Sequence, residues 1–76
     1  MDPPRDASFW MENTLIPLDM LFIRSDGRIA RIAEKTKPLS LDPVPSGEPV
    51  AAVLEIRGGR AAELGIREGD LVRWSR

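Results

Sequence analysis

The sequence predicts a mostly β domain of the α+β class, with several antiparallel strands and one short helix. Three observations support this fold class: short apolar segments separated by turn residues, an Asp-Gly pair between two of them, and one helical turn that ends at a glycine. The 76 residues leave room for one domain and one core. No parallel βαβ alternation is long enough for a doubly wound fold.

The N-terminal half predicts a tail followed by a hairpin. Residues 1–7 are expected to form a frayed, disordered tail, because Pro3 and Pro4 prevent a helix from starting there, and residues 8–76 to form the domain. Residues 18–23 are almost continuously apolar, which is typical of a strand covered on both faces. Asp26-Gly27 suits a two-residue type I′ turn, so residues 18–24 and 28–34 are expected to pair. The second arm also has helical spacing, which leaves a helix open as its alternative.

Residues 36–49 contain four prolines and are expected to form a long loop. Proline lacks an N–H donor, so this segment should not continue a sheet ladder. Long loops in compact domains are often functional or disordered. A strand is expected next, over residues 50–57, with Val50, Ala52, Leu54 and Ile56 on one side, and it should end at Gly58-Gly59.

The C-terminal residues predict a short helix and a last strand. Residues 60–64 make about one helical turn, and Gly65 stands where a left-handed C-cap residue is expected. Ile66 should then fold back onto the helix. Residues 67–70 turn the chain into a strand over residues 71–74.

Composition and charge exclude several classes of site. The chain has neither cysteine nor histidine, which excludes disulfides, thiolate zinc sites and imidazole metal sites, and we expect no metal and no cofactor. A formal charge of −1 gives no reason to expect nucleic-acid binding. No apolar run approaches the length of a membrane span, so no membrane partner is expected. The acidic, proline-rich start resembles no signal peptide, which predicts a cytoplasmic protein as given, or an exported one if a leader has been removed.

Two stretches then resemble a known family. FWMENTLIPLDMLFI followed by SDGRI, and later VLEIRGGRAAELGIREGDLV, are similar to the bacterial and archaeal domain of unknown function 192 family. Its aromatic-Trp-Met-x-Asn-Thr segment, Pro-hydrophobic-Asp step, Asp-Gly hairpin, Val-Leu-Glu strand and Gly-Ile-x-x-Gly-Asp turn occur here in order, from Phe9 to Val72. The resemblance implies a compact, barrel-like, β-rich α+β domain and no known activity.

The sequence departs from the family pattern at its front. Members usually carry a further N-terminal segment with a strand before the Trp-Met motif, whereas this chain begins eight residues before Phe9. An omitted strand would leave an unpaired edge, which is a template for pairing with another chain. We therefore expect a homodimer, or a partner that covers the missing strand, and a domain that is incomplete without it.

The segment FWMENTLIPLD is the candidate site. One interpretation is structural: Asn13 and Thr14 bond to nearby backbone, and Pro17 extends the chain before it, so the segment forms a bend that feeds the next strand. The other interpretation is functional: Trp10, Asn13, Thr14 and Asp19 supply an aromatic plate, an amide, a hydroxyl and a carboxylate to a small polar ligand. We expect a small ligand-binding or protein-interaction module.

The alternative is a hydrolase or carbohydrate-acting enzyme that uses Asp19 with Asn13 and Thr14. Burial between apolar neighbours would raise the pKa of Asp19 toward a range useful to a general base, although such a residue more often accepts backbone N–H bonds from the loop before it. Separately, residues 24–37 carry five basic side chains against two acidic ones, which indicates a solvated hairpin face or a strip for a small anion. The final turn also resembles that of PDZ-like modules, but no carboxylate-binding glycine loop accompanies it.

Overall fold

The computed structural model describes residues 4–9, 11, 14–40 and 43–72. Its elements are, in chain order, β1 (Ser8–Phe9), β2 (Leu18–Ile23), β3 (Ile29–Ala33), β4 (Val44–Pro45), β5 (Ala52–Arg57) and α1 (Arg60–Glu63). All pairing is antiparallel: a three-stranded sheet of order β3-β2-β5, and a small β1-β4 sheet. The predicted class, mostly β with one short helix, is confirmed. Among the described residues the two sheets stay separate and do not close into a barrel.

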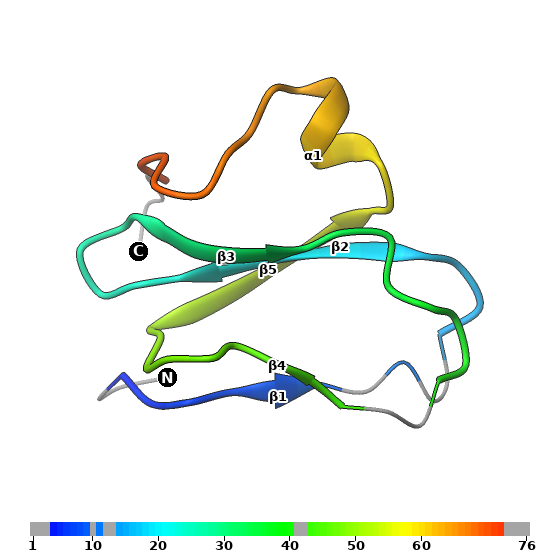
Figure 1. Ribbon diagram of the computed structural model, residues 1–76, viewed down its shortest axis with the longest axis horizontal. Coiled ribbons are helices and arrows are strands. Elements are labelled where there is room, and N and C mark those ends of the chain that lie inside the picture. The colour runs from blue at the N-terminus through cyan, green and yellow to red at the C-terminus, as the bar shows by residue number, and fades with distance from the viewer. Residues whose placement is uncertain (1–3, 10, 12–13, 41–42, 73–76) are drawn as a thin grey trace.

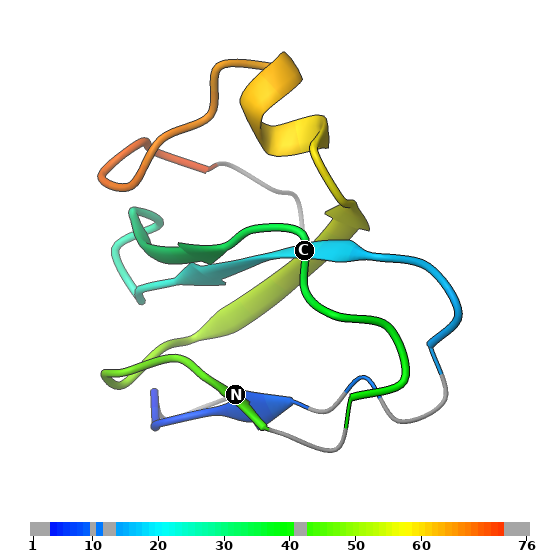
Figure 2. The same ribbon diagram turned by 45° about the vertical axis from the view of Figure 1, so that its right-hand side comes forward.

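The molecule is built in three layers. Figure 1 shows α1 on one side of the three-stranded sheet and the β1-β4 pair on the other, and Figure 2 shows the same order from a second angle. Each interface holds an apolar cluster. Met20 and Phe22 point toward the β1-β4 layer, and Leu21 points toward α1. Strand β2 is therefore buried on both faces, as its apolar sequence predicts.

The hairpin between β2 and β3 is confirmed, but its turn differs from the expected type. Arg24 N–H donates to Arg28 O at 2.8 Å, which leaves three residues in the loop, and Gly27 N–H donates to Arg24 O at 2.9 Å. Only Gly27 has a left-handed backbone, with φ of +90°, whereas a type I′ turn needs positive φ at both central residues. The turn is of the kind in which glycine closes a three-residue loop.

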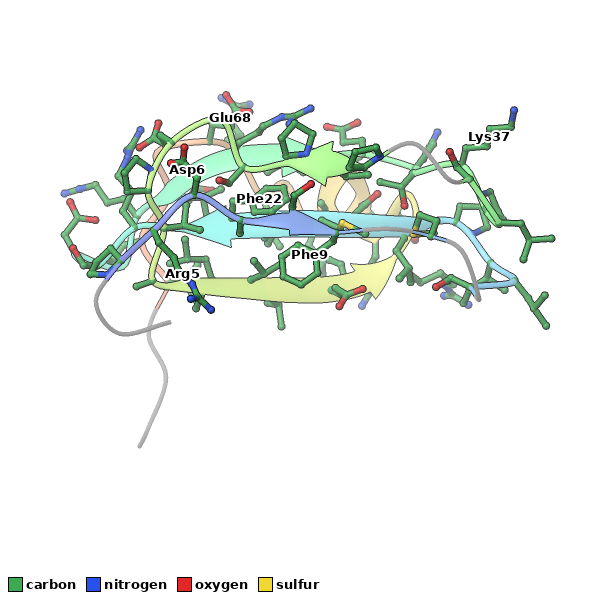
Figure 3. All side chains as sticks on the ribbon, turned by 90° about the horizontal axis from the view of Figure 1, so that it is seen from below. Arg5, Asp6, Phe9, Phe22, Lys37 and Glu68 are labelled. Atoms are coloured by element: carbon green, nitrogen blue, oxygen red, sulfur yellow. The ribbon has the colours of Figure 1, made fainter. Side chains whose placement is uncertain are left out.

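Two expectations are wrong: that the proline-rich residues 36–49 make no sheet pairing, and that residues 1–7 form a frayed tail. Pro45 pairs with Ser8 in the β1-β4 ladder, although residues 36–49 were expected to make no sheet pairing. Arg5 lies in the expected frayed tail, yet it exchanges backbone hydrogen bonds with Val50 at 3.0 and 2.8 Å. Ala7 is buried, and its N–H donates to Ser46 Oγ at 2.9 Å. These short ladders pack onto β2, where Phe9 lies 6.2 Å from Phe22 between ring centres (Figure 3).

The helix and its glycine end are confirmed. Gly65, with φ of +70°, donates its N–H to Ala62 O at 3.1 Å, and Ile66 N–H donates to Ala61 O at 2.9 Å. These two bonds are those of a Schellman motif, and Ile66 packs back onto the cluster under α1. The strand expected over residues 71–74 is reduced, among its described residues, to a single bridge between Leu71 and Arg28.

Candidate functional site

The described residues of FWMENTLIPLD do not all line one pocket. Trp10 and Asn13 lie outside the described residues. Thr14 is half-buried and holds a turn by its backbone: its N–H donates to Met11 O at 3.1 Å, and its C=O accepts from Leu39 N–H at 3.0 Å. Asp19 lies on β2, on the face that α1 covers, and is fully buried. The set expected to hold a ligand is therefore not assembled by its described members.

Asp19 binds three backbone N–H groups from two distant turns. Its Oδ1 accepts from Lys35 N–H at 2.8 Å and from Gly59 N–H at 3.1 Å, and its Oδ2 accepts from Ala61 N–H at 2.9 Å and from Gly59 N–H at 3.1 Å. We call Asp19, Lys35, Gly59 and Ala61 together the Asp19 clamp. Gly59 is the N-cap residue of α1 and has no side chain that could cap the helix. Asp19, on strand β2, supplies the capping carboxylate instead.

The clamp also holds two left-handed backbones. Lys35 has φ of +48° and Gly59 has φ of +90°. A lysine adopts this conformation only at a cost, and the bond from its N–H to a buried carboxylate helps to offset that cost. Gly58, beside the clamp, donates its N–H to Pro17 O at 2.9 Å, and a Cβ at Gly58 would lie 2.9 Å from Pro17 Cβ. Asp19 and the Gly58-Gly59 pair, which are far apart in the sequence, thus lie next to each other in the fold.

The environment of Asp19 lowers its pKa. Burial by itself raises the pKa of this carboxyl, but the N–H groups of Lys35, Ala61 and Gly59, with the Lys35 charge, lower it by more, and the result is below the ordinary value of 3.8. A general base at neutral pH needs the opposite shift and access to a substrate. The raised pKa considered for the enzyme alternative is therefore wrong. Asp19 does accept backbone N–H bonds, but its donors follow it in the chain, whereas the loop before it was expected to supply them.

A groove lies elsewhere, between β3 and the loop that carries β4. It has a volume of about 420 Å³. We call it the β3 groove, and it is lined by Met11, Arg31, Ile32, Ala33, Glu34, Thr36, Lys37, Ser40, Pro43, Val44 and Pro45. Of the segment FWMENTLIPLD, the described lining includes only Met11. Asp19 and Thr14 do not line the groove.

The walls of the β3 groove are held by specific contacts. Thr36 is buried: its hydroxyl lies 2.8 Å from Leu18 O and 3.2 Å from Met11 Sδ. Arg31 reaches across the groove, and its Nη1 donates to Pro45 O. Leu39 has a left-handed φ of +61° and is tied by its N–H to Thr14 O, which fixes the loop beside the groove.

The charge of the β3 groove comes from part of the basic strip noted in the sequence. Arg24 of that strip is bound to Glu48, with Nε and Oε1 2.7 Å apart, and Arg28 Nη1 donates to Gly69 O at 3.1 Å. Arg31 and Lys37 instead line the groove and form no ion pair among the described residues. Figure 3 shows the Lys37 amine extended at the end of the molecule. Sequence reasoning noticed the strip but could not select these two residues, because proximity to residues 43–45 depends on the fold.

The described part of the chain offers neither a cluster of metal ligands nor a helix that could span a membrane. No group of three or more acidic side chains there is placed to hold a metal ion. No helix among these residues is both long and apolar enough to cross a bilayer.

Comparison with known proteins identifies relatives of this chain. A crystal structure of a protein of unknown function from Novosphingobium aromaticivorans DSM 12444 is 50% identical and superposes with a TM-score of 0.93, over 97% of this chain and 53% of that chain. A crystal structure from Sinorhizobium meliloti 1021, described as a candidate transcription regulator, is 46% identical with a TM-score of 0.89, over 93% of this chain and 55% of that chain. This chain thus spans about half the length of these relatives. Comparison with curated proteins gives no significant match.

The family model agrees with the resemblance found in the sequence. The model of the domain of unknown function 192 family (DUF192), described as an uncharacterized ACR, matches residues 1–74. That match covers both stretches on which the resemblance was based, including Asp19 and Gly59 of the Asp19 clamp. The chain belongs to the DUF192 family.

Proposed function

We propose that this chain is a small ligand-binding module and that the β3 groove is its binding site. The observation that carries the proposal is the combination of an apolar wall with two cationic side chains at one groove of about 420 Å³. Ligand sites in proteins typically combine a mostly apolar concave surface with a few placed polar groups. Pro43 and Val44 supply the accessible apolar part, and Arg31 and Lys37 supply the charge.

The charges favour a small anion with an apolar part. Two cations, Arg31 and Lys37, face one carboxylate, Glu34, along the lining. Arg31 presents a planar fork that matches a carboxylate in two-point contact, although one of its N–H groups is engaged by Pro45 O. Lys37 is exposed and adds a point charge at the mouth. An aliphatic carboxylate would place its chain against Pro43 and Val44 and its charge between the two cations.

The enzyme alternative draws no support from Asp19. Both carboxylate oxygens of Asp19 already accept hydrogen bonds from backbone N–H groups. The side chain is also fully buried, and its pKa is lowered. Asn13, the proposed helper, is outside the described residues. Loss of function after a change at Asp19 would therefore report unfolding of the clamp, not loss of a reacting group.

The proposal is tested by a titration followed by amide NMR. The probes are hexanoate, glucose, a neutral tetrapeptide and a short DNA duplex, the last because one relative is described as a candidate transcription regulator. Hexanoate is expected to shift the amides of Ile32, Ala33 and Val44, which line the groove, and to leave those of α1 in place. Millimolar affinity is typical of so small a ligand and so open a site.

Matched variants separate the groove from general charge. Lys37→Gln should weaken hexanoate binding severalfold, because it removes a cation at the groove. Lys35→Gln removes the same charge two residues away, from a side chain that does not line the groove, and should leave binding unchanged. The proposal fails if no probe shifts the groove amides at millimolar concentration, or if the two variants lose affinity equally.

A further inference from the structure

The two edges of the three-stranded sheet differ in whether other parts of the chain bond to their outward backbone groups. The outer edge of β3 is covered: Ile29 N–H donates to Asp70 O at 2.9 Å, Gly69 N–H donates to Ile29 O at 2.7 Å, and Ile32 N–H donates to Glu68 Oε2 at 3.1 Å. Strand β5, at the opposite edge, pairs with β2 alone within the described part of the chain. In Figure 3 it forms the margin of the sheet, with no other strand drawn beyond it.

The register of β5 identifies which backbone groups point outward. Gly58 N–H bonds to Pro17 O on the β2 side, and the direction of backbone groups alternates along an antiparallel strand. The N–H and C=O groups of Arg57, Glu55 and Val53 therefore point away from β2. Among the described residues these groups have no partner. An open edge of this kind is a template for another strand.

The side chains of β5 are compatible with pairing at this edge. Glu55 and Arg57 are exposed and, being two residues apart, lie on one face of the strand. Leu54, on the other face, is 44% exposed. β5 contains no proline that would block a further ladder, and its two charged side chains, Glu55 and Arg57, have opposite signs, so they can attract a second strand of the same sequence.

We propose that the outer edge of β5 pairs with the same edge of a second copy of this chain, antiparallel about a two-fold axis at Ile56. In this register Glu55 of each copy stands opposite Arg57 of the other, and both opposed pairs carry opposite charges. A two-fold axis at Glu55 would instead oppose two like carboxylates, which destabilises a strand pair. An axis at Leu54 would place Val53 opposite the glutamate. The charge pattern selects the first register.

This pairing would join the two three-stranded sheets into one continuous sheet. Each Glu55 and Arg57 would exchange backbone hydrogen bonds with the other copy, and the two Ile56 side chains would meet across the axis. The β3 groove would remain open, because its lining residues lie on β3 and the β4 loop, at the other side of the sheet. The inference is thus independent of the proposed ligand site.

The test measures the molar mass of the whole chain by sedimentation equilibrium over a wide range of concentrations. The native chain is expected to approach the mass of two copies at high concentration. Glu55→Lys alone, or Arg57→Glu alone, opposes like charges in both pairs and should weaken dimerisation roughly tenfold. A chain that stays monomeric throughout, or a dimer unaffected by either reversal, would overturn the proposal.

Two combinations establish that the contact is between copies and fix its register. An equimolar mixture of the Glu55→Lys and Arg57→Glu chains should form a mixed dimer, because each Lys or Arg then opposes a Glu. The double variant E55K/R57E should again form a dimer with itself. A mixture that associates while the double variant stays monomeric would overturn the register, because a two-fold axis at Glu55 gives that result. Circular dichroism of the dilute variants checks that each is folded.

Discussion

Replacement of Asp19 by asparagine tests the clamp without changing its shape. The carboxylate offers two oxygens to three backbone N–H groups, from Lys35, Gly59 and Ala61. Asparagine offers one oxygen and an NH₂ group. Whichever way the amide is turned, its NH₂ faces either Lys35 N–H or Ala61 N–H, so one buried donor loses its acceptor.

The cost follows from these contacts. A buried donor left without an acceptor costs about 1–3 kcal/mol, and the bonds that remain lose the strength that the charge gave them. We expect Asp19→Asn to lower the free energy of unfolding by about 2–4 kcal/mol. A domain of 76 residues has a total of roughly 4–11 kcal/mol, so the variant loses a large part of its stability. The midpoint of thermal unfolding should fall by roughly 10–30 °C.

The assay is urea unfolding followed by circular dichroism at neutral pH. Asp6→Asn is the matched control, because Asp6 is exposed and makes no hydrogen bond or ion pair within the described part of the chain. We expect that control to stay within about 0.5 kcal/mol of the native chain. The clamp is refuted if Asp19→Asn also stays within that limit.

Two further predictions concern the same region. Gly58→Ala should destabilise the fold by about 1–3 kcal/mol, because the new Cβ would lie 2.9 Å from Pro17 Cβ and 3.1 Å from Pro17 O, and urea unfolding measures this; an unchanged midpoint would contradict the close approach. The lowered pKa of Asp19 predicts a stability contribution that is complete well above pH 3.8 and is lost as the pH falls from about 3.8 through the folded-state pKa. The difference in free energy of unfolding between the native chain and Asp19→Asn should therefore shrink in acid, and a difference that grows there would contradict the sign.

Local signals in the sequence predicted the elements that local physics determines. The continuous apolar run of β2 matches its burial on both faces, and Gly27 marks the hairpin turn. Gly65 ends α1 in the left-handed backbone that glycine adopts without strain. Each of these features depends on residues a few positions apart, which is why pattern and composition were sufficient.

The rest depends on contacts between distant residues. Among the described residues, the β1-β4 ladder has two pairs. It joins Ser8 to Pro45 and so includes a proline, which a general rule excludes from a ladder interior. The partners of Asp19 lie 16 to 42 positions further along the chain, so the sequence indicated a backbone acceptor but placed its donors wrongly, in the loop before it. The β3 groove exists because residues 37–40 and 43–45 lie beside β3, which no spacing in the sequence predicts.

The most direct test of the account is an NMR titration of the side-chain carboxyl carbon of Asp19 in the folded protein. The central claim is that Asp19 is a buried structural acceptor and that binding belongs to the β3 groove. The account predicts a titration midpoint for Asp19 below 3.8, with the Lys35, Gly59 and Ala61 amide signals shifting in the same transition. A midpoint above 3.8, in the range of a general base, would contradict it.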